Sequence, residues 1–181
     1  LKTLDDALQL RRHLLLAFER AEAETDPGKR AAWLSFAIVG GGPIGLATAL
    51  DLCRRGVPVV LLDDHEGAGL GSRALCFSKR TLEICDRLGA AGPMLEKGVQ
   101  WNVGKVFHDD RLLYEFNLLP EGGHAFPAFI NLQQPWFEKF LHDAIVQAQT
   151  EGAPTLGPDA LPASATICSC HNVSKGAICA A

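Results

Sequence analysis

The sequence predicts an α/β protein built around a Rossmann-like βαβ unit. Three observations lead to this prediction. A short apolar segment at 36–39 runs into a glycine-rich turn, an apolar helical segment at 43–55 follows the turn, and a second apolar segment at 57–62 follows the helix. Two strands joined by a helix in this order pair in parallel. We expect this core to be incomplete, with an amphipathic helix before it and a loose C-terminal tail after it.

The turn has the sequence Gly40-Gly-Gly-Pro-Ile-Gly45, in which three glycines have the G-x-G-x-x-G spacing. In this motif Gly40 permits a tight turn, Gly42 lets the backbone approach a pyrophosphate, and Gly45 lets the helix pack closely on the strand. The helix start at Pro43 and Ile44 offers free amides and a partial positive charge to phosphates. We therefore predict a dinucleotide site here. The alternative is a glycine turn with a purely structural role.

A carboxylate stands where such a site needs one. The second strand ends at Asp63, about 20 residues beyond the glycines, where a dinucleotide fold places the residue that binds a ribose hydroxyl. Asp64 follows directly and is included in the same candidate site. The intervening helix has one apolar face, formed by Leu46, Ala49, Leu50 and Cys53. The whole βαβ unit is therefore present in order.

The composition excludes several classes of protein. The chain has 181 residues, of which 48% are hydrophobic, and this is enough for the packed core of one domain. A net charge of −4 gives no reason to expect nucleic acid as a partner. The longest uncharged run, at 31–50, is interrupted by glycines and a proline, so we expect no membrane span. No secretory signal opens the chain, so we expect a cytoplasmic location with reduced cysteines.

Residues 1–35 are predicted to form an amphipathic helix and a short second helix. Thr3 caps the first helix, and Asp26-Pro27 ends it and starts the second. An apolar stripe recurs at helical spacing and consists of Leu4, Leu8, Leu15 and Phe18. We expect this stripe to hold the helix across the βαβ core.

Beyond the second strand, the pattern predicts loops, two helices and a hairpin. A glycine-rich loop at 67–74 precedes a helix from Lys79 to Leu88, which Ser78 caps. Segments at 103–108 and 112–116 alternate around an acidic turn, as in a β-hairpin. After a loop at 118–129, a helix is predicted from Asn131 to Gln149. Its inward side chains are Phe137, Leu141, Ala144, Ile145 and Ala148.

Three ordered motifs make residues 36–149 resemble FAD-dependent aromatic-ring hydroxylases, which are flavoprotein monooxygenases. The motifs are the glycine turn, Ser72-Arg73-Ala74 with Arg80-Thr-Leu-Glu83 and Leu88-Gly89, and a Gln-x-x-x-Glu-x-x-Leu pattern at Gln134, Glu138 and Leu141. The resemblance implies a Rossmann-like FAD/NAD(P)-binding domain. It also implies FAD as cofactor, NAD(P)H as reductant and a small phenolic substrate.

The same resemblance implies that Arg73 and Gln134 contact the flavin. An arginine beside a glycine loop can pair its fork of N–H donors with a pyrophosphate. A solvent-exposed loop arginine and an exposed helix-start glutamine are the alternatives. The candidate cofactor-binding residues are therefore Gly40, Gly42, Pro43, Ile44, Gly45, Asp63, Asp64, Arg73 and Gln134. No catalytic acid or base is identified. The family's later Asp-Gly and Gly-Asp motifs have no counterpart, so we expect this FAD-binding oxidoreductase fragment to be inactive alone.

The two ends of the chain resemble other redox proteins. Residues 1–43 resemble type II NADH dehydrogenases, in which this segment precedes the glycine turn of the NADH-binding domain. An NADH-binding fragment is therefore one alternative function, and a non-enzymatic composite chain is another. Residues 165–181 resemble the start of the bacterioferritin-associated-ferredoxin type of 2Fe–2S domain of nitrite reductases, because of the Cys168-Ser-Cys170 pair.

A cluster requires four thiolates, and the second cysteine pair of that family has no counterpart here. We therefore expect no bound metal and an oxidisable tail. The sequence divides into an N-terminal helical segment, a partial FAD-binding domain, a linker rich in Pro, Gly and Ala, and a cysteine-containing fragment. Their ranges are 1–35, 36–149, 150–164 and 165–181. The oligomeric state is not indicated by the sequence.

Overall fold

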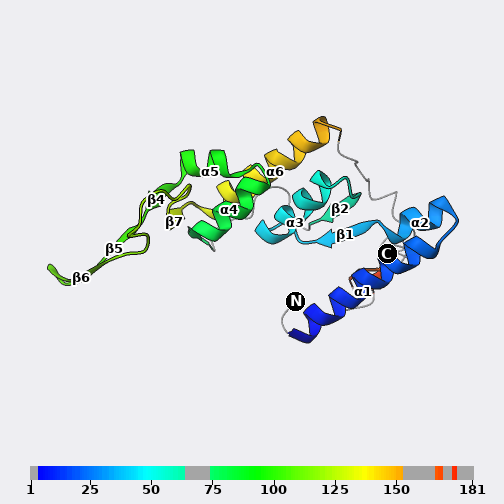
Figure 1. Ribbon diagram of the computed structural model, residues 1–181, viewed down its shortest axis with the longest axis horizontal. Helices are drawn as coiled ribbons and strands as arrows, with labels where there is room; N and C mark the ends of the chain where they lie inside the picture. Colours follow the sequence, from blue (N-terminus) through cyan, green and yellow to red (C-terminus); the bar gives the residue numbers. More distant parts are fainter. Residues whose placement is uncertain (1–3, 64–73, 153–165, 169–172, 175–181) are drawn as a thin grey trace.

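The computed structural model describes residues 4–63, 74–152, 166–168 and 173–174 (Figure 1). Its helices are α1 (Leu4–Ala23), α2 (Pro27–Trp33), α3 (Pro43–Arg54), α4 (Lys79–Arg87), α5 (Ala91–Lys97) and α6 (Gln134–Thr150). Its strands are β1 (Phe36–Val39), β2 (Val59–Leu62), β3 (Cys76–Ser78), β4 (Val99–Trp101), β5 (Val103–His108), β6 (Arg111–Asn117), β7 (Phe129–Asn131), β8 (Thr166–Cys168) and β9 (Val173–Ser174). Within these ranges, no helix combines the length and the apolar composition that a membrane crossing requires.

β1 and β2 form the parallel pair that the sequence predicts, with Phe36 opposite Val59. α3 connects the two strands and packs against both of them. The α/β fold with an incomplete Rossmann-like core is therefore confirmed. β2 begins later than the predicted Val57. The reason is that the amide of Val57 donates a 2.9 Å hydrogen bond to the carbonyl of Leu52 and so closes the C-terminal turn of α3.

A second, antiparallel sheet has the strand order β3-β7-β4. The sequence did not predict these strands, because segments of three residues are too short to establish an alternating pattern. The prediction that a helix begins at Asn131 is wrong. Asn131 belongs to β7, where its side chain accepts a 3.1 Å hydrogen bond from the indole of Trp101, and α6 begins only at Gln134.

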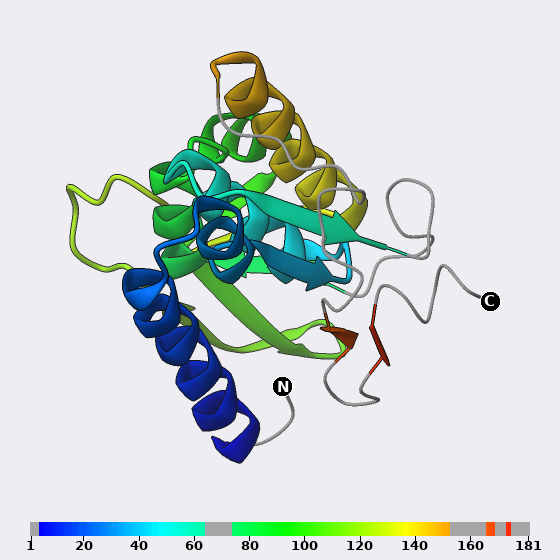
Figure 2. The same cartoon turned by 90° about the vertical axis from the view of Figure 1, so that its right-hand side faces the viewer.

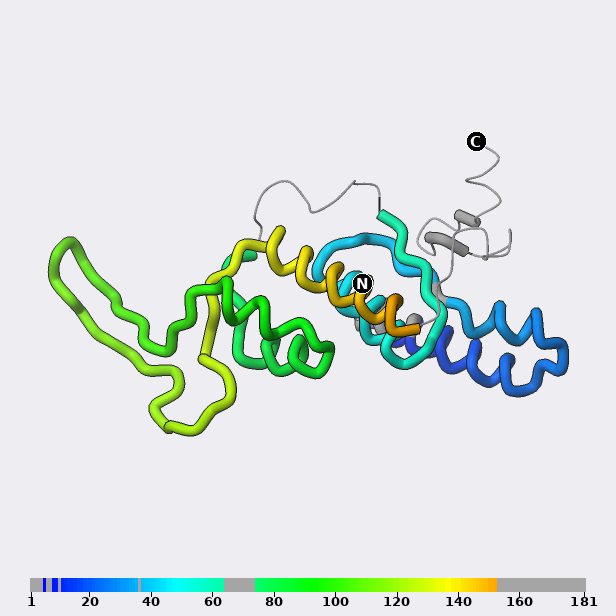
Figure 3. Tube along the Cα trace, turned by 90° about the horizontal axis from the view of Figure 1, so that it is seen from above, coloured from blue at the N-terminus to red at the C-terminus, as the bar shows by residue number. Residues whose placement is uncertain are grey.

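The hydrophobic core lies where α3 and α6 pack together and meet the antiparallel sheet, α4 and α5. Its largest fully buried side chains are Leu50, Leu82, Cys85, Met94, Ile130 and Leu141. The rings of Phe77 and Phe137 stack at a centroid distance of 4.3 Å and join β3 to α6. Figure 3 shows this core in the middle of the molecule, between the projecting β5–β6 hairpin and the α1–α2 pair.

The predictions for α4 and for the hairpin are confirmed. The Ser78 hydroxyl accepts a hydrogen bond from the amide of Thr81 and so caps α4. Leu82 and Cys85 of this helix point inward. β5 and β6 pair in antiparallel fashion around a turn in which Asp109 has a positive φ of 51°.

α1 does not use its predicted apolar stripe to cover the core. The side chains of Leu8 and Leu15 remain 44% and 51% exposed, and Phe18 is 50% exposed. The helix packs against α2 instead, with Ala21 buried and the Arg20 guanidinium 4.8 Å from the Trp33 ring centroid. Figure 2 shows α1, in dark blue, extending away from the parallel strands.

The apolar stripe stays exposed because charged side chains lie on the same face of α1. Arg12 and Glu19 alternate with Leu8 and Leu15 at spacings of four and three residues, so all four side chains share one face of the helix. Burying that face would remove two charges from water.

The described residues of the C-terminal tail include two short strands. β8 and β9 pair in antiparallel fashion, and β8 lies beside β1. Cys168 ends β8, whereas Cys170 lies outside the described residues.

Candidate nucleotide-binding site

The glycine turn connects the end of β1 to the start of α3. Gly40 has a φ of +106°, a backbone conformation that a side chain would strain. Its amide donates a 2.7 Å hydrogen bond to the carbonyl of Leu62, which extends the pairing between β1 and β2 by one residue. The turn is therefore fixed against the end of the second strand.

Gly45 is required by close packing. A Cβ atom at this position would overlap the carbonyl oxygen of Gly40, and the backbone cannot yield as a flexible side chain could. This is the geometry that the third glycine of the motif predicts, with the first turn of α3 pressed against the turn from β1.

Gly42 differs, because it faces open space. Apart from Gly42 and its two chain neighbours, no heavy atom of the described residues lies within 4 Å of the position that a Cβ on Gly42 would occupy. Gly42 is the N-cap of α3, and Pro43 occupies the first helical position. The first four amides of a helix have no partner within it, and Pro43 carries none, so those of Gly42, Ile44 and Gly45 remain. Open space next to the amides of a helix N-terminus suits a phosphate group.

Asp63 lies directly beside this turn. Its carboxylate accepts a hydrogen bond from the backbone amide of Gly41, across 22 residues of sequence. A Cβ on Gly41 would lie 2.6 Å from Oδ2 of Asp63, so a glycine here allows the carboxylate to approach. The sequence reasoning missed Gly41, which occupies a variable position of the motif. The run of three consecutive glycines was the signal that could have identified it.

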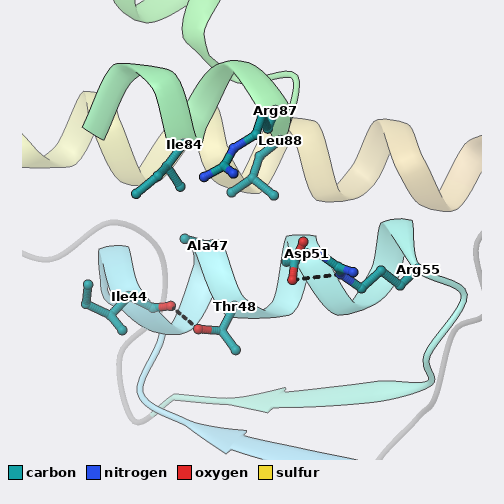
Figure 4. A pocket seen from close by; sticks show the side chains of 8 residues that line it. All are labelled: Ile44, Ala47, Thr48, Asp51, Arg55, Ile84, Arg87 and Leu88. Carbon is teal, nitrogen blue, oxygen red and sulfur yellow. Dashed lines mark hydrogen bonds and ion pairs between the residues drawn. The ribbon is translucent and has the colours of Figure 1, made fainter. Parts of the chain in front are cut away.

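Ile44, the second residue of α3, is 82% exposed and begins a groove between α3 and α4 (Figure 4). The groove has a volume of about 470 Å³ and is lined by Ile44, Ala47, Thr48, Asp51, Arg55, Ile84, Arg87 and Leu88. A 2.9 Å hydrogen bond joins Asp51 and Arg55, and it raises the pKa of the Arg55 guanidinium. The groove follows the outer face of α3, away from the face that packs in the core.

Gln134 lies at the start of α6, and its side-chain amide donates a 2.7 Å hydrogen bond to Oε1 of Glu138. Glu138 is 5% exposed, so its carboxylate is buried. Gln134 therefore holds a buried carboxylate on its own helix. The structure brings Gly40, Gly42, Gly45 and Asp63 together. Asp64 and Arg73 lie outside the described residues.

Two buried thiols, those of Cys53 and Cys85, belong to the hydrophobic core. Burial raises the pKa of the Cys85 thiol to about 11. Burial also raises the pKa of Cys53, against the opposing charge of Arg54. In the part of the chain that the structure describes, no group of three or more His, Cys, Asp or Glu side chains could hold a metal ion.

A model of the FAD binding domain family matches residues 34–154, which is more than half of the chain. The chain belongs to the FAD binding domain family. The match covers the glycine turn, Asp63 and the start of α6. Together with its hydroxylase and monooxygenase relatives, this match confirms the predicted resemblance to flavin-dependent aromatic hydroxylases. FAD is the cofactor of the family.

Relatives of this FAD binding domain include a probable NADH-specific resorcinol 4-hydroxylase from Rhodococcus jostii. It is 32% identical over 129 residues, which cover 68% of this chain and 24% of the hydroxylase. The crystal structure of the flavin-dependent monooxygenase PieE in complex with FAD and substrate is similar, with a TM-score of 0.55 and 26% identity. That similarity covers 68% of this chain and 23% of PieE.

A short match to a different enzyme supports the second resemblance. The type II NADH:quinone oxidoreductase Ndh of Mycobacterium tuberculosis is 51% identical over 49 residues, which cover 27% of this chain and 11% of the dehydrogenase. The chain thus spans about a quarter or less of each of these proteins. The resemblance of residues 165–181 to an iron–sulfur domain stays a prediction.

Proposed function

We propose that the glycine turn binds the ADP half of FAD, with the diphosphate against the amides of Gly42, Ile44 and Gly45. The observation that carries this proposal is the open space at Gly42, at the N-terminus of α3 and beside a carboxylate. Backbone amides and the partial positive charge of the helix start stabilise phosphate oxygens. The space at Gly42 is where a side chain would exclude them.

In this proposal Asp63 binds the ribose of the adenosine. The carboxylate lies at the turn, where an acceptor for a ribose hydroxyl is needed. It would exchange its hydrogen bond with the Gly41 amide for one with the sugar, or keep both through its two oxygens. Asp64 follows Asp63 directly in the sequence and is assigned to the same site. Arg73 is assigned to the pyrophosphate or flavin and Gln134 to the isoalloxazine half, as the hydroxylase motifs imply.

The reaction that we propose for the whole protein is NAD(P)H-dependent hydroxylation of a phenolic ring. The probable NADH-specific resorcinol 4-hydroxylase among the relatives supports this substrate class. When FAD is bound it supplies the electron transfer and the oxygen chemistry, and the protein supplies binding and orientation. In this proposal the named residues bind the cofactor, and none of them is assigned as an acid or a base. We therefore expect this chain to bind FAD without hydroxylating a phenol.

The test is a titration of the purified chain with FAD, followed by the change in flavin fluorescence. Gly42→Leu fills the open space and should weaken FAD binding at least tenfold, because hydrogen bonds from amides to a charged phosphate contribute about 1.5–3 kcal/mol each. Gly92→Leu is the matched control, since Gly92 also lies near a helix start with no atom within 4 Å of its Cβ position among the described residues. Equal affinity in the two variants would contradict the site.

The rival function is binding of NADH by a type II dehydrogenase fragment, which the short match to Ndh favours. Both dinucleotides carry an ADP half, so the glycine turn does not separate them. Parallel titrations with FAD and with NADH do. Tight FAD binding with no competition from NADH supports the hydroxylase assignment, whereas NADH binding that FAD does not displace supports the rival.

A further inference from the structure

The exposed face of α1 carries a pattern of charges and apolar side chains that the nucleotide site does not use. Leu8, Arg12, Leu15 and Glu19 recur at spacings of four, three and four residues and therefore share one face. All four side chains are exposed. The buried Ala21 lies on the opposite side of the helix, toward α2. We call these four residues the α1 stripe.

The position of α1 leaves the stripe accessible. α1 packs against α2, and both lie at the end of the molecule away from the β5–β6 hairpin (Figures 1 and 3). Leu8 and Leu15 are 44% and 51% exposed, and Leu16, at the edge of the stripe, is 41% exposed. Apolar side chains that recur along one face of a projecting helix are typical of a surface that meets another helix.

The charges of the stripe select the partner and its direction. A parallel copy of α1 would place Arg12 against Arg12 and Glu19 against Glu19, which repel. In an antiparallel pair, we place the two-fold axis beside Leu15 and Leu16. Arg12 of each chain then lies opposite Glu19 of the other chain, which gives two ion pairs. The same arrangement brings the Leu15 side chains of the two chains together between the two ion pairs. The stripe is therefore complementary to itself in one orientation.

We propose that two copies of this chain associate through antiparallel packing of their α1 helices, with Leu15 at the centre and reciprocal Arg12–Glu19 ion pairs on either side. α1 has 20 residues and is therefore about 30 Å long. The proposed contact is a single helix pair, whereas a standard interface buries roughly 1,200–2,000 Å² with about 20–30 residues a side. The dimer is therefore weak, and its population depends on protein concentration.

The test is sedimentation velocity of the full chain over about two orders of magnitude in concentration. The wild-type protein should shift from monomer to dimer. Arg12→Glu and Glu19→Arg should each weaken self-association at least about tenfold, because each places two like charges against each other. Arg111→Glu, a charge reversal of equal size on the exposed hairpin, should leave the dimer unchanged. Circular dichroism of each variant verifies that it is folded.

Mixing the two variants gives the decisive measurement. A chain with Arg12→Glu carries two acidic groups on the stripe, and a chain with Glu19→Arg carries two basic groups, so a heterodimer regains both ion pairs. Sedimentation of the equimolar mixture should restore dimer to at least the wild-type level. A mixture that stays monomeric would refute the proposed register, and so would a dimer that the single reversals do not weaken.

A vesicle sedimentation assay separates a second copy of the chain from a membrane surface as the partner of the stripe. If the wild-type chain stays monomeric but sediments with vesicles that contain anionic lipid, the stripe binds a membrane surface and the proposal is wrong. Both readouts are independent of FAD, so failure of the nucleotide site does not affect them.

Discussion

The carboxylate of Asp63 accepts a hydrogen bond from the backbone amide of Gly41, and this contact ties the end of β2 to the turn that follows β1. The two residues are 22 positions apart, and the parallel pairing of the strands brings them together. The carboxylate is thus held at the turn by the fold itself. The carboxylate lies beside the space at Gly42 for two reasons: the strand pairing brings the backbone of Asp63 to the turn, and the aspartate side chain reaches the Gly41 amide.

This contact leads to a prediction about coupling. Asp63→Ala removes the carboxylate, and Gly41→Ala displaces it, because a Cβ at that position would lie 2.6 Å from Oδ2. We expect each variant to weaken FAD binding to a similar extent. The double variant should bind no more weakly than either single variant, because both changes act on the same group. The measurement is FAD titration of all four proteins. Losses that add in the double variant would show that the two residues act separately.

Substitution of two helical glycines by alanine should change stability in opposite directions. A Cβ on Gly45 overlaps the backbone oxygen of Gly40, so Gly45→Ala should lower the free energy of unfolding by about 1–3 kcal/mol. Gly92 lies in α5 with no described atom within 4 Å of its Cβ position, so Gly92→Ala should raise it by roughly 0.4–1 kcal/mol. Urea unfolding measures both. Equal effects would mean that the Gly40–Gly45 contact is looser than described.

The local part of this fold was predictable from the sequence, because its signals are local. The glycine spacing placed the turn between β1 and α3, and Ser78 marked the start of α4. The β3-β7-β4 sheet was not predictable, because strands of three residues are defined by partners some 30 or 50 positions away. Asn131 illustrates this. The sequence around it favours a helix start, but its pairing with Cys76 and Val99 places it in strand β7.

The candidate site divides in the same way. The G-x-G-x-x-G spacing identified Gly40, Gly42 and Gly45. Gly40 has a positive φ, Gly42 faces open space, and Gly45 is too close to the backbone of Gly40 for a side chain. Gly41 was missed because its requirement comes from Asp63, a residue distant in the sequence. The apolar stripe of α1 was predicted to face inward because periodicity identifies a face and not its partner. The charges of Arg12 and Glu19 on the same face indicate that this face stays in water.

The stacked rings of Phe77 and Phe137 should stabilise the junction of β3 with α6 beyond their burial. Both side chains are at least nine-tenths buried, with ring planes 25° apart. We expect Phe77→Leu and Phe137→Leu each to lower the free energy of unfolding, and a double-mutant cycle to give a coupling of about 0.5–1.5 kcal/mol. Trp136 and Phe140 are tilted, 6.0 Å apart and more exposed, so the same cycle there should give a smaller value. Equal couplings would contradict a specific role for the stack.

The buried thiol of Cys85 makes stability depend on pH in the alkaline range. Burial raises its pKa from the ordinary 9.0 to about 11, so the folded protein keeps this proton more tightly than the unfolded chain. Above pH 9 the unfolded chain ionises first, and the free energy of unfolding must fall as pH rises toward 11. The expected loss is about 2–3 kcal/mol, at 1.36 kcal/mol per pKa unit.

Cys85→Ala should be less stable at neutral pH, because a buried side chain is truncated, but its stability should fall less between pH 9 and pH 11. Urea unfolding of both proteins across this range isolates the thiol, since lysine and tyrosine titrate in both. Parallel curves would mean that Cys85 ionises as readily in the folded protein as in the unfolded chain.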